Sequence, residues 1–306
     1  MRNIPNVDLQ DSYQLNAQQI QSIGDALREW GFVNLIGHGV ANQKIQNAYR
    51  VAQDVFALSE QEKKQYEDRE GGRQRGYTPF LLEKAKNASL GDLKEFWHIG
   101  RDLPQDHPYL RSQQMRPNLF PSEVPAFAEI MRALFDDLDR LAHVILKAIE
   151  EYLGYEEHTL QNLAQDGNSI LRVLHYPDLT DVDTAGRVRA AAHEDINLLT
   201  LLPAATQPGL ELLTRQGEWM PINAPLGSII CDTGDMMNLL TSGDMPATTH
   251  RVVNPDDAVR GARLSMPFFM HPHPNARLKP LNQDSNDLGM TAHEFLTQRL
   301  QENSLI

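Results

Sequence analysis

The spacing of apolar residues changes near residue 168, and this change limits the folds that are open to the chain. From there on, short apolar runs alternate with Gly, Pro, Asn and Asp, as in SILRVLHYP, INLLTLLP, LELLT, EWMPI, GSIICDTGD, THRVVN and RLSMPFFMH. Short strands separated in this way are typical of a β-sandwich or a barrel. We therefore expect an all-β core in the second half of the chain.

The first half favours helices around one early strand. Asn16 is placed to cap a helix that continues to Trp30, and FVNLI at 32–36 indicates a buried strand. A further helix is predicted over 45–55, and Ser59 with Glu62 forms a capping box for a short one. The longest helical pattern, from Pro125 to Leu153, has an apolar face that could buttress a sheet.

The length of 306 residues exceeds a typical domain, but β-sandwiches and barrels commonly form one unit of about 200 to 250 residues. We expect one integrated unit, with an N-terminal helical and strand region at 1–120 and a core with supporting helices at 121–306. The charged segment EDREGGRQRG at 67–76 is predicted to be a mobile loop that forms a lid or a rim.

The overall charge disfavours some classes of partner. A formal net charge of −13 and a pI near 5.3 argue against nucleic acid and anionic membranes, which need basic faces. Cys231 is the only cysteine, so no intramolecular disulfide can form. The chain has neither a signal-peptide pattern at its start nor an apolar stretch of about 18 residues. We expect a cytoplasmic protein with a small-molecule partner, and its oligomeric state stays open.

Two histidines and an aspartate have a spacing that suits a metal. Residues two apart point to the same face of a strand, so one strand can present both His193 and Asp195. His250 adds a second imidazole from a distant segment. Two imidazoles and one carboxylate form the facial arrangement that leaves coordination positions open on a non-haem Fe(II). An H-x-D triplet is expected about once by chance in such a composition, so its neighbours carry the argument.

Arg263 and Ser265 are also two residues apart, in RLSMPFF. A guanidinium and a hydroxyl on one strand face can bind a carboxylate. A dicarboxylate co-substrate held there could reach the iron.

An ordered series of segments resembles the isopenicillin N synthase-like family of Fe(II)- and 2-oxoglutarate-dependent dioxygenases over nearly the full length. The segments are IPNVDL, WGFVNLIGHGV, FALSEQEKKQY, RGY, DLKEFWHI, HYP, HEDINLLTLL, GLELL, GEWMPI, GDMMNLLTSG, HRVVNP and RLSMPFF. The resemblance implies a mainly β fold with helices. In it, a double-stranded β-helix (jelly-roll) core is buttressed by the long helix and by an N-terminal α/β region.

The resemblance also implies roles for single residues. Fe(II) would be bound by His193, Asp195 and His250. The co-substrate 2-oxoglutarate, which is consumed with O2, would be bound by Arg263, Ser265 and Tyr176. Members of the family commonly have Asn two positions before this tyrosine, where the present chain has Leu174. One polar contact to the co-substrate is therefore expected to be missing.

Strand alternation extends these roles to a substrate pocket. If Tyr176 faces the cavity, Arg172 faces it too, and the alternation from Ser265 adds Phe269 and His271. The family's pocket-lining segment adds Phe96 and His98. Arg75 and Tyr77 are expected over the cavity mouth, with a simple turn at RGY as the equal alternative. Such a pocket suits a small or medium polar substrate that carries a carboxylate, for example an amino acid or a peptide-like acid. Plain packing is the alternative for the two phenylalanines, a core position is the alternative for His98, and a surface ion pair is the alternative for Arg172.

Three functions are compatible with these residues. The first is a 2-oxoglutarate-dependent oxygenase that hydroxylates, desaturates or cyclises a small metabolite. The second is an iron oxidase of the same fold that does not consume 2-oxoglutarate. The third is a non-catalytic sensor that binds a metal or a small acid. Open iron positions favour an enzyme over a sensor, because a sensor has no need of them.

Overall fold

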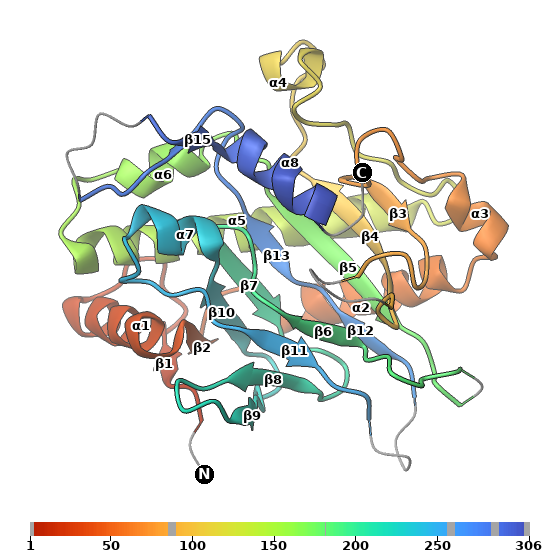
Figure 1. The fold of residues 1–306 in the computed structure, drawn as a ribbon, viewed down its shortest axis with the longest axis horizontal. Coiled ribbons are helices and arrows are strands. Elements are labelled where there is room, and N and C mark those ends of the chain that lie inside the picture. The colour runs from red at the N-terminus through yellow and green to blue at the C-terminus, as the bar shows by residue number, and fades with distance from the viewer. Residues whose placement is uncertain (1–2, 85–89, 181, 256–260, 283–287, 303–306) are drawn as a thin grey trace.

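Two β-sheets pack against each other and enclose an apolar interior, with most helices outside them (Figure 1). The protein is described here from a computed structural model, which covers residues 3–84, 90–180, 182–255, 261–282 and 288–302. Between the sheets, Phe32 and Tyr176 of the larger sheet pack with Leu212 and Val252 of the smaller one. The expected mainly β fold with helices is confirmed.

The larger sheet has the strand order β1-β2-β10-β7-β13-β5-β4-β3, and β12 also pairs with β5. Its strands are β1 (Asn6–Asp8), β2 (Phe32–Ile36), β3 (Gly76–Thr78), β4 (Glu95–Gly100), β5 (Ile170–Tyr176), β7 (Leu199–Pro203), β10 (Ile229–Thr233), β12 (Arg263–Ser265) and β13 (Phe268–Met270). All pairs in it are antiparallel except β1 with β2. The sheet takes strands from both predicted regions, and the boundary at residue 120 stays a prediction.

The smaller sheet has the order β6-β11-β8-β9. Its strands are β6 (Ala190–His193), β8 (Leu210–Leu213), β9 (Trp219–Pro221) and β11 (His250–Val252), and a separate short pair consists of β14 (Arg277–Leu278) and β15 (Met290–Thr291). The strands predicted after residue 168 are therefore present. They form the two sheets of the jelly-roll that the family resemblance implied.

The helices are α1 (Ala17–Trp30), α2 (Asn42–Phe56), α3 (Glu60–Lys64), α4 (Pro108–Arg111), α5 (Ala126–Leu153), α6 (Thr159–Ala164), α7 (Asp235–Leu240) and α8 (Ala292–Glu302). Asn16 and Ser59 form the predicted capping boxes of α1 and α3. Gly31 ends α1 in the left-handed conformation, at φ 67°. No helix within the described ranges has the length and apolar character needed to span a membrane.

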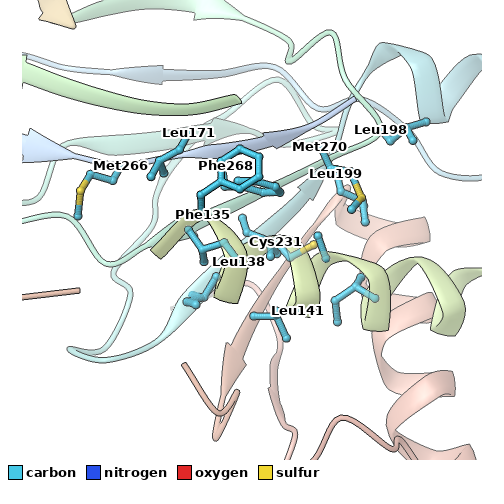
Figure 2. Close-up of a cluster of buried hydrophobic side chains, with 14 of the residues drawn as sticks. Phe135, Leu138, Leu141, Leu171, Leu198, Leu199, Cys231, Met266, Phe268 and Met270 are labelled. Carbon is cyan, nitrogen blue, oxygen red and sulfur yellow. The ribbon is translucent and has the colours of Figure 1, made fainter. Parts of the chain in front are cut away.

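Helix α5 covers the outer face of the larger sheet, as predicted (Figure 2). Phe135 of α5 meets Phe268 of β13 edge to face, with ring centroids 5.0 Å apart. Leu138 and Leu141 continue this buried face along the helix. Because α5 covers the outer face, the inner face of the sheet is left for the interior between the sheets, where the functional residues lie.

The segment 67–76 is anchored to the rest of the protein. Arg116 forms an ion pair with Asp68, with Nη2 and Oδ1 2.9 Å apart. The carbonyl oxygen of Arg73 lies 2.9 Å from Nδ1 of His98. Gln74 is the residue of this segment that lines the cavity beside the histidines described below. The segment 67–76 therefore lies at the rim of this cavity. The mobility of the segment stays a prediction.

Candidate metal centre and adjoining cavities

His193, Asp195 and His250 come together at one point between the sheets. Each offers one ligand atom, and these atoms lie within 4.8 Å of one another. Oδ1 of Asp195 lies 3.8 Å from Nε2 of His193 and 3.7 Å from Nε2 of His250. Among the described residues, this is the one group of three or more His, Cys, Asp or Glu side chains with such a spacing. Its two imidazoles and one carboxylate suit Fe(II).

Two neighbouring strands position the histidines. His193 ends β6 and His250 begins β11, and the two residues are directly paired. Asp195 follows β6 instead of lying within it, which corrects the expectation that one strand holds both residues. The chain leaves the sheet after His193, and this exit brings the carboxylate within 3.8 Å of Nε2 of both rings.

Backbone carbonyls orient the two rings. Nδ1 of His193 lies 2.7 Å from the carbonyl of Ala191, and Nδ1 of His250 lies 3.1 Å from that of Thr248. A carbonyl can only accept, so each Nδ1 carries the proton and each Nε2 keeps a lone pair for a metal. Burial, followed by electrostatic repulsion between the two rings when His250 is protonated, lowers the pKa of His193. The ring is therefore held neutral, as a metal ligand must be.

A small chamber of about 60 Å³ connects the metal centre with Arg263. Arg263 is buried, and its Nε donates to the carbonyl of Gln207 over 3.0 Å. Its Nη1 is buried without a hydrogen-bond partner in the described part of the chain. A buried guanidinium with an unused donor fits a carboxylate from a bound ligand. Ser265 and Tyr176 line the same chamber.

Strand alternation places the residues of this chamber as predicted. Tyr176 stands opposite Arg263, and Leu174 stands opposite Ser265, in the pairing of β5 with β12. Leu174 and Arg172 line the chamber together with Tyr176. The apolar Leu174 thus occupies a position beside the predicted carboxylate clamp.

A second, larger cavity of about 310 Å³ is also lined by His193 and Asp195 of the metal centre. Of the predicted substrate residues, His98, Arg172, Phe269 and His271 line it. The larger cavity and the small chamber share Lys94, Arg172, His193, Asp195 and Phe269. Leu296, Arg299 and Leu300 of α8 form one wall. The metal centre therefore lies where the two spaces meet.

Arg172 is held in one orientation by several neighbours. Its Nε donates to Nε2 of His98 over 2.7 Å, and its Nη1 to Oε1 of Glu83 over 3.0 Å. Its guanidinium lies 4.3 Å from the ring centroid of Phe96 and 5.3 Å from that of Phe269. Nη2 has no hydrogen-bond partner among the residues that the structure describes. One edge of the cation is therefore free to meet a ligand.

Three predicted substrate residues lie away from the cavity lining. Phe96 is fully buried beneath Arg172 and belongs to the lining of neither cavity. Arg75 is buried as well, and its Nη2 donates to Oδ1 of Asn168 over 3.0 Å. The hydroxyl of Tyr77 donates to Glu95 on the outer face of the sheet. Arg75 and Tyr77 therefore do not cover the mouth, because their side chains satisfy internal partners instead.

Two further residues, which were not expected from the sequence, belong to the site. Lys94 lines both cavities, and its Nζ lies 2.9 Å from Oε1 of Glu83. Lys94 precedes Phe96 and His98 by steps of two, so the same alternation along DLKEFWHI could have found it. Glu83 lies in a connection without regular structure, and no sequence pattern marks it.

Comparisons with known proteins agree with this geometry. Residues 167–272 match the family model of the 2OG-Fe(II) oxygenase superfamily, and residues 4–123 match the model described as the non-haem dioxygenase in morphine synthesis N-terminal. The 2-oxoglutarate-dependent dioxygenase citB of Monascus ruber is 31% identical over 92% of this chain and 88% of its own length. The caaD dioxygenase of Aspergillus niger, also 2-oxoglutarate-dependent, is 28% identical over 97% of this chain and 92% of its own.

Solved structures show the same fold. A Caulobacter crescentus protein assigned to the 2OG-Fe(II) oxygenase family is 40% identical, with a TM-score of 0.84 over 97% of this chain and 98% of its own. A Neurospora crassa protein, solved at full length in complex with alpha-KG, is 22% identical with a TM-score of 0.84 over 97% and 96% of the two chains. The match to the second protein shows the fold alone.

Proposed function

Because this chain belongs to the 2OG-Fe(II) oxygenase superfamily, we propose that it oxidises a small polar metabolite that presents a carboxylate to Arg172. The protein is an oxidoreductase that uses Fe(II), 2-oxoglutarate and O2. Family membership thus favours the first of the three functions considered above. Hydroxylation, desaturation and ring closure remain the candidate outcomes.

The roles of the central residues follow from their positions. Bound Fe(II) with 2-oxoglutarate and O2 supplies the oxidising power of the reaction. Three residues are proposed to bind the metal: His193, Asp195 and His250. Three more are proposed to bind the co-substrate in the small chamber: Arg263, Ser265 and Tyr176. The unused Nη1 of Arg263 supports this assignment, because a buried donor without a partner is costly.

The environment of Arg172 carries the proposal for the substrate. His98 and Glu83 hold two of its nitrogens, and the free Nη2 edge belongs to a cation that lines both cavities. A guanidinium fixed in this way loses little conformational freedom when it binds an oxygen acceptor. A substrate bound to Arg172 therefore lies beside the metal centre, with the rest of the molecule in the larger cavity.

Ion pairs around Arg172 limit what else can bind there. Glu83 is shared between Arg172 and Lys94, and Lys94 also pairs with Asp92, with Nζ and Oδ2 2.8 Å apart. The charge of Lys94 is thus satisfied within the protein, whereas Arg172 keeps a free donor. His271 completes this part of the lining and is proposed to contact the substrate, as is Phe269.

A substrate screen tests the proposal. Fe(II)-loaded protein is given 2-oxoglutarate with small carboxylic acids, including amino acids, and with their amides, and succinate formation above the substrate-free background is measured. We expect acids to be accepted and their amides to be poor. In Arg172→Gln, the KM for the acid should rise about tenfold or more while the KM for 2-oxoglutarate is unchanged, since a hydrogen bond to a charged group contributes about 1.5–3 kcal/mol.

Two further variants make this test specific. Arg172→Lys keeps the charge but lacks the planar fork, so it should recover little of the loss. Arg251→Gln is the matched control, because Arg251 lies on β11 and lines neither cavity. Arg251 also forms an ion pair with Glu211, with Nη2 and Oε2 2.7 Å apart. Equal use of acids and amides, or an unchanged KM in Arg172→Gln, would overturn the proposed substrate class.

We also infer that the protein is located in the cytoplasm. A second inference is that its partner is a small molecule and not nucleic acid or a membrane. The net charge of −13 supports the second point, since both macromolecular partners attract basic proteins. The single, buried Cys231 is compatible with a reducing compartment. Fractionation of the producing cells would test the location directly.

A further inference from the structure

The two carboxylate oxygens of Asp195 have separate partners. Oδ1 faces Nε2 of His193 and Nε2 of His250, at 3.8 and 3.7 Å. Oδ2 points the other way and accepts a hydrogen bond from the hydroxyl of Thr200. One oxygen is therefore directed to the metal centre and the other to the protein.

Asn197 determines the direction of this hydrogen bond. Its Nδ2 lies 3.0 Å from the carbonyl of Leu199 and 3.0 Å from Oγ1 of Thr200. The carbonyl can only accept, which identifies the atom facing it as the amide nitrogen. That nitrogen donates to Thr200 as well, so the hydroxyl of Thr200 accepts from Asn197 and gives its own hydrogen to Asp195.

Burial and sheet pairing make this chain of hydrogen bonds rigid. Asn197 and Thr200 are 0% and 2% exposed, so bulk water does not compete for their polar atoms. Thr200 lies in β7, where it pairs with Asp232 of β10 on one side and with Phe269 of β13 on the other. Asp195, in contrast, lies in the connection after β6. The hydroxyl therefore ties an irregular segment to a central strand.

We propose that Thr200, oriented by Asn197, is a positioning residue that holds Asp195 as a one-oxygen ligand of the iron. This inference rests on the proposed role of Asp195 in binding the metal. A hydrogen bond to the second oxygen fixes the plane of the carboxylate and keeps Oδ2 away from the metal. The coordination positions needed by co-substrate and O2 then stay free, because the carboxylate occupies one position instead of two. Partners of this kind commonly contribute about 10- to 100-fold to metal affinity.

Equilibrium metal binding tests the proposal without turnover. Fe(II) is titrated anaerobically into the wild type, Thr200→Val and Thr200→Ser, and Co(II) is titrated in parallel to follow its visible spectrum. Valine keeps the branched shape of threonine and lacks the hydroxyl, and serine keeps the hydroxyl. We expect an affinity loss of about 10- to 100-fold and an altered Co(II) spectrum in Thr200→Val, with near-wild-type values in Thr200→Ser.

A change at Asn197 tests the direction of the hydrogen bonds. In Asn197→Asp, the new carboxylate can only accept, so it competes with Asp195 for the hydrogen of Thr200. Metal affinity should then fall as in Thr200→Val. Far-UV circular dichroism of each metal-free variant checks that the fold is retained. If Thr200→Val does not fold, Thr200→Ser is compared with the wild type instead. We expect Thr200→Ser to bind Fe(II) with wild-type affinity, and a loss of affinity in this variant would overturn the proposal.

Asp195→Ala separates the possible failures. If Asp195→Ala binds Fe(II) as tightly as the wild type, the proposed metal site is wrong. If Asp195→Ala loses the metal while Thr200→Val and Asn197→Asp keep full affinity and an unchanged Co(II) spectrum, the metal site holds and the positioning role of Thr200 is overturned.

Discussion

Nε of Arg172 donates a hydrogen bond to Nε2 of His98 over 2.7 Å. A guanidinium is always a donor, so this ring nitrogen must accept, and the proton of the neutral ring lies on Nδ1, which faces the carbonyl of Arg73 at 2.9 Å. Burial, followed by the charge of Arg172, holds the pKa of His98 well below its ordinary value. His98 therefore orients Arg172 and has both nitrogens occupied, so its expected contact with the substrate is better described as indirect.

Replacing His98 should weaken the substrate site and spare the co-substrate site. In His98→Leu, Nε of Arg172 loses its acceptor. The KM for the acid substrate should then rise about tenfold, because a hydrogen bond to a charged group contributes about 1.5 kcal/mol. His98→Gln offers a carbonyl acceptor and should recover part of this. Steady-state KM values for the acid and for 2-oxoglutarate give the comparison. Equal effects on both would show a general structural role instead.

Loss of the Arg263 cation should weaken binding of 2-oxoglutarate. In Arg263→Leu, a buried carboxylate would lose its charged partner, and such a loss costs about 2–5 kcal/mol. We expect calorimetry with Mn(II)-loaded protein to show an affinity decrease of about 30-fold or more, from the low end of that range. Arg251→Leu is a matched control on β11 outside both cavities. An unchanged affinity in Arg263→Leu would place the co-substrate elsewhere.

The metal-free protein should lose stability below about pH 6.5, partly through His271. Burial is the main cause that lowers the pKa of His271 to about 4, and the residue is 4% exposed. Between about pH 6.5 and 4 the unfolded chain binds a proton that the folded chain does not, so the free energy of unfolding falls as pH falls, by about 1.4 kcal/mol per pH unit. Above about pH 6.5 both states are neutral at this residue and its contribution is constant.

Urea unfolding at several pH values measures this slope. His271→Phe removes the titrating group. The free energy of unfolding of this variant should therefore fall less steeply with decreasing pH than that of the wild type, and the two slopes should differ by up to about 1.4 kcal/mol per pH unit, the value for one proton. A variant and a wild type with parallel pH profiles would show that His271 is not held neutral by the fold.

The packing of α5 on the larger sheet should contribute strongly to stability. Phe135 is 4% exposed and meets Phe268 edge to face. Phe135→Ala should lower the free energy of unfolding by about 3–5 kcal/mol, as is usual for a buried phenylalanine. Leu226→Ala is the control, because Leu226 is 90% exposed and its change should stay within about 0.5 kcal/mol. A small effect in Phe135→Ala would mean that α5 is not the buttress.

The sequence predicted those parts of the fold and the site that depend on local patterns. Alternation from Tyr176 along β5 predicted that Arg172 lines the same cavity, and alternation along β12 predicted that Ser265 shares a face with Arg263, because the period of two in a strand is strict. The capping box at Asn16 predicted the start of α1 because it is a local interaction.

Features that depend on long-range packing could not be predicted in this way. Arg75 stands in a charged, glycine-containing segment, yet it is buried against Asn168, a partner 93 positions further along the chain. Glu83 reaches Arg172 from a connection, and only the folded chain brings the two together. Asp195 lies beyond the end of β6, since strand ends are set by sheet pairing as much as by local residues.

Succinate formation by the wild type and by His193→Ala is the most direct test of the metal centre. Fe(II)-loaded protein is incubated with 2-oxoglutarate and O2, and both succinate and consumed O2 are measured. We predict that the wild type forms about one succinate per O2, and that His193→Ala forms none while its thermal unfolding midpoint stays close to that of the metal-free wild type. Full succinate formation by His193→Ala, or O2 consumption by the wild type without succinate, would contradict the account.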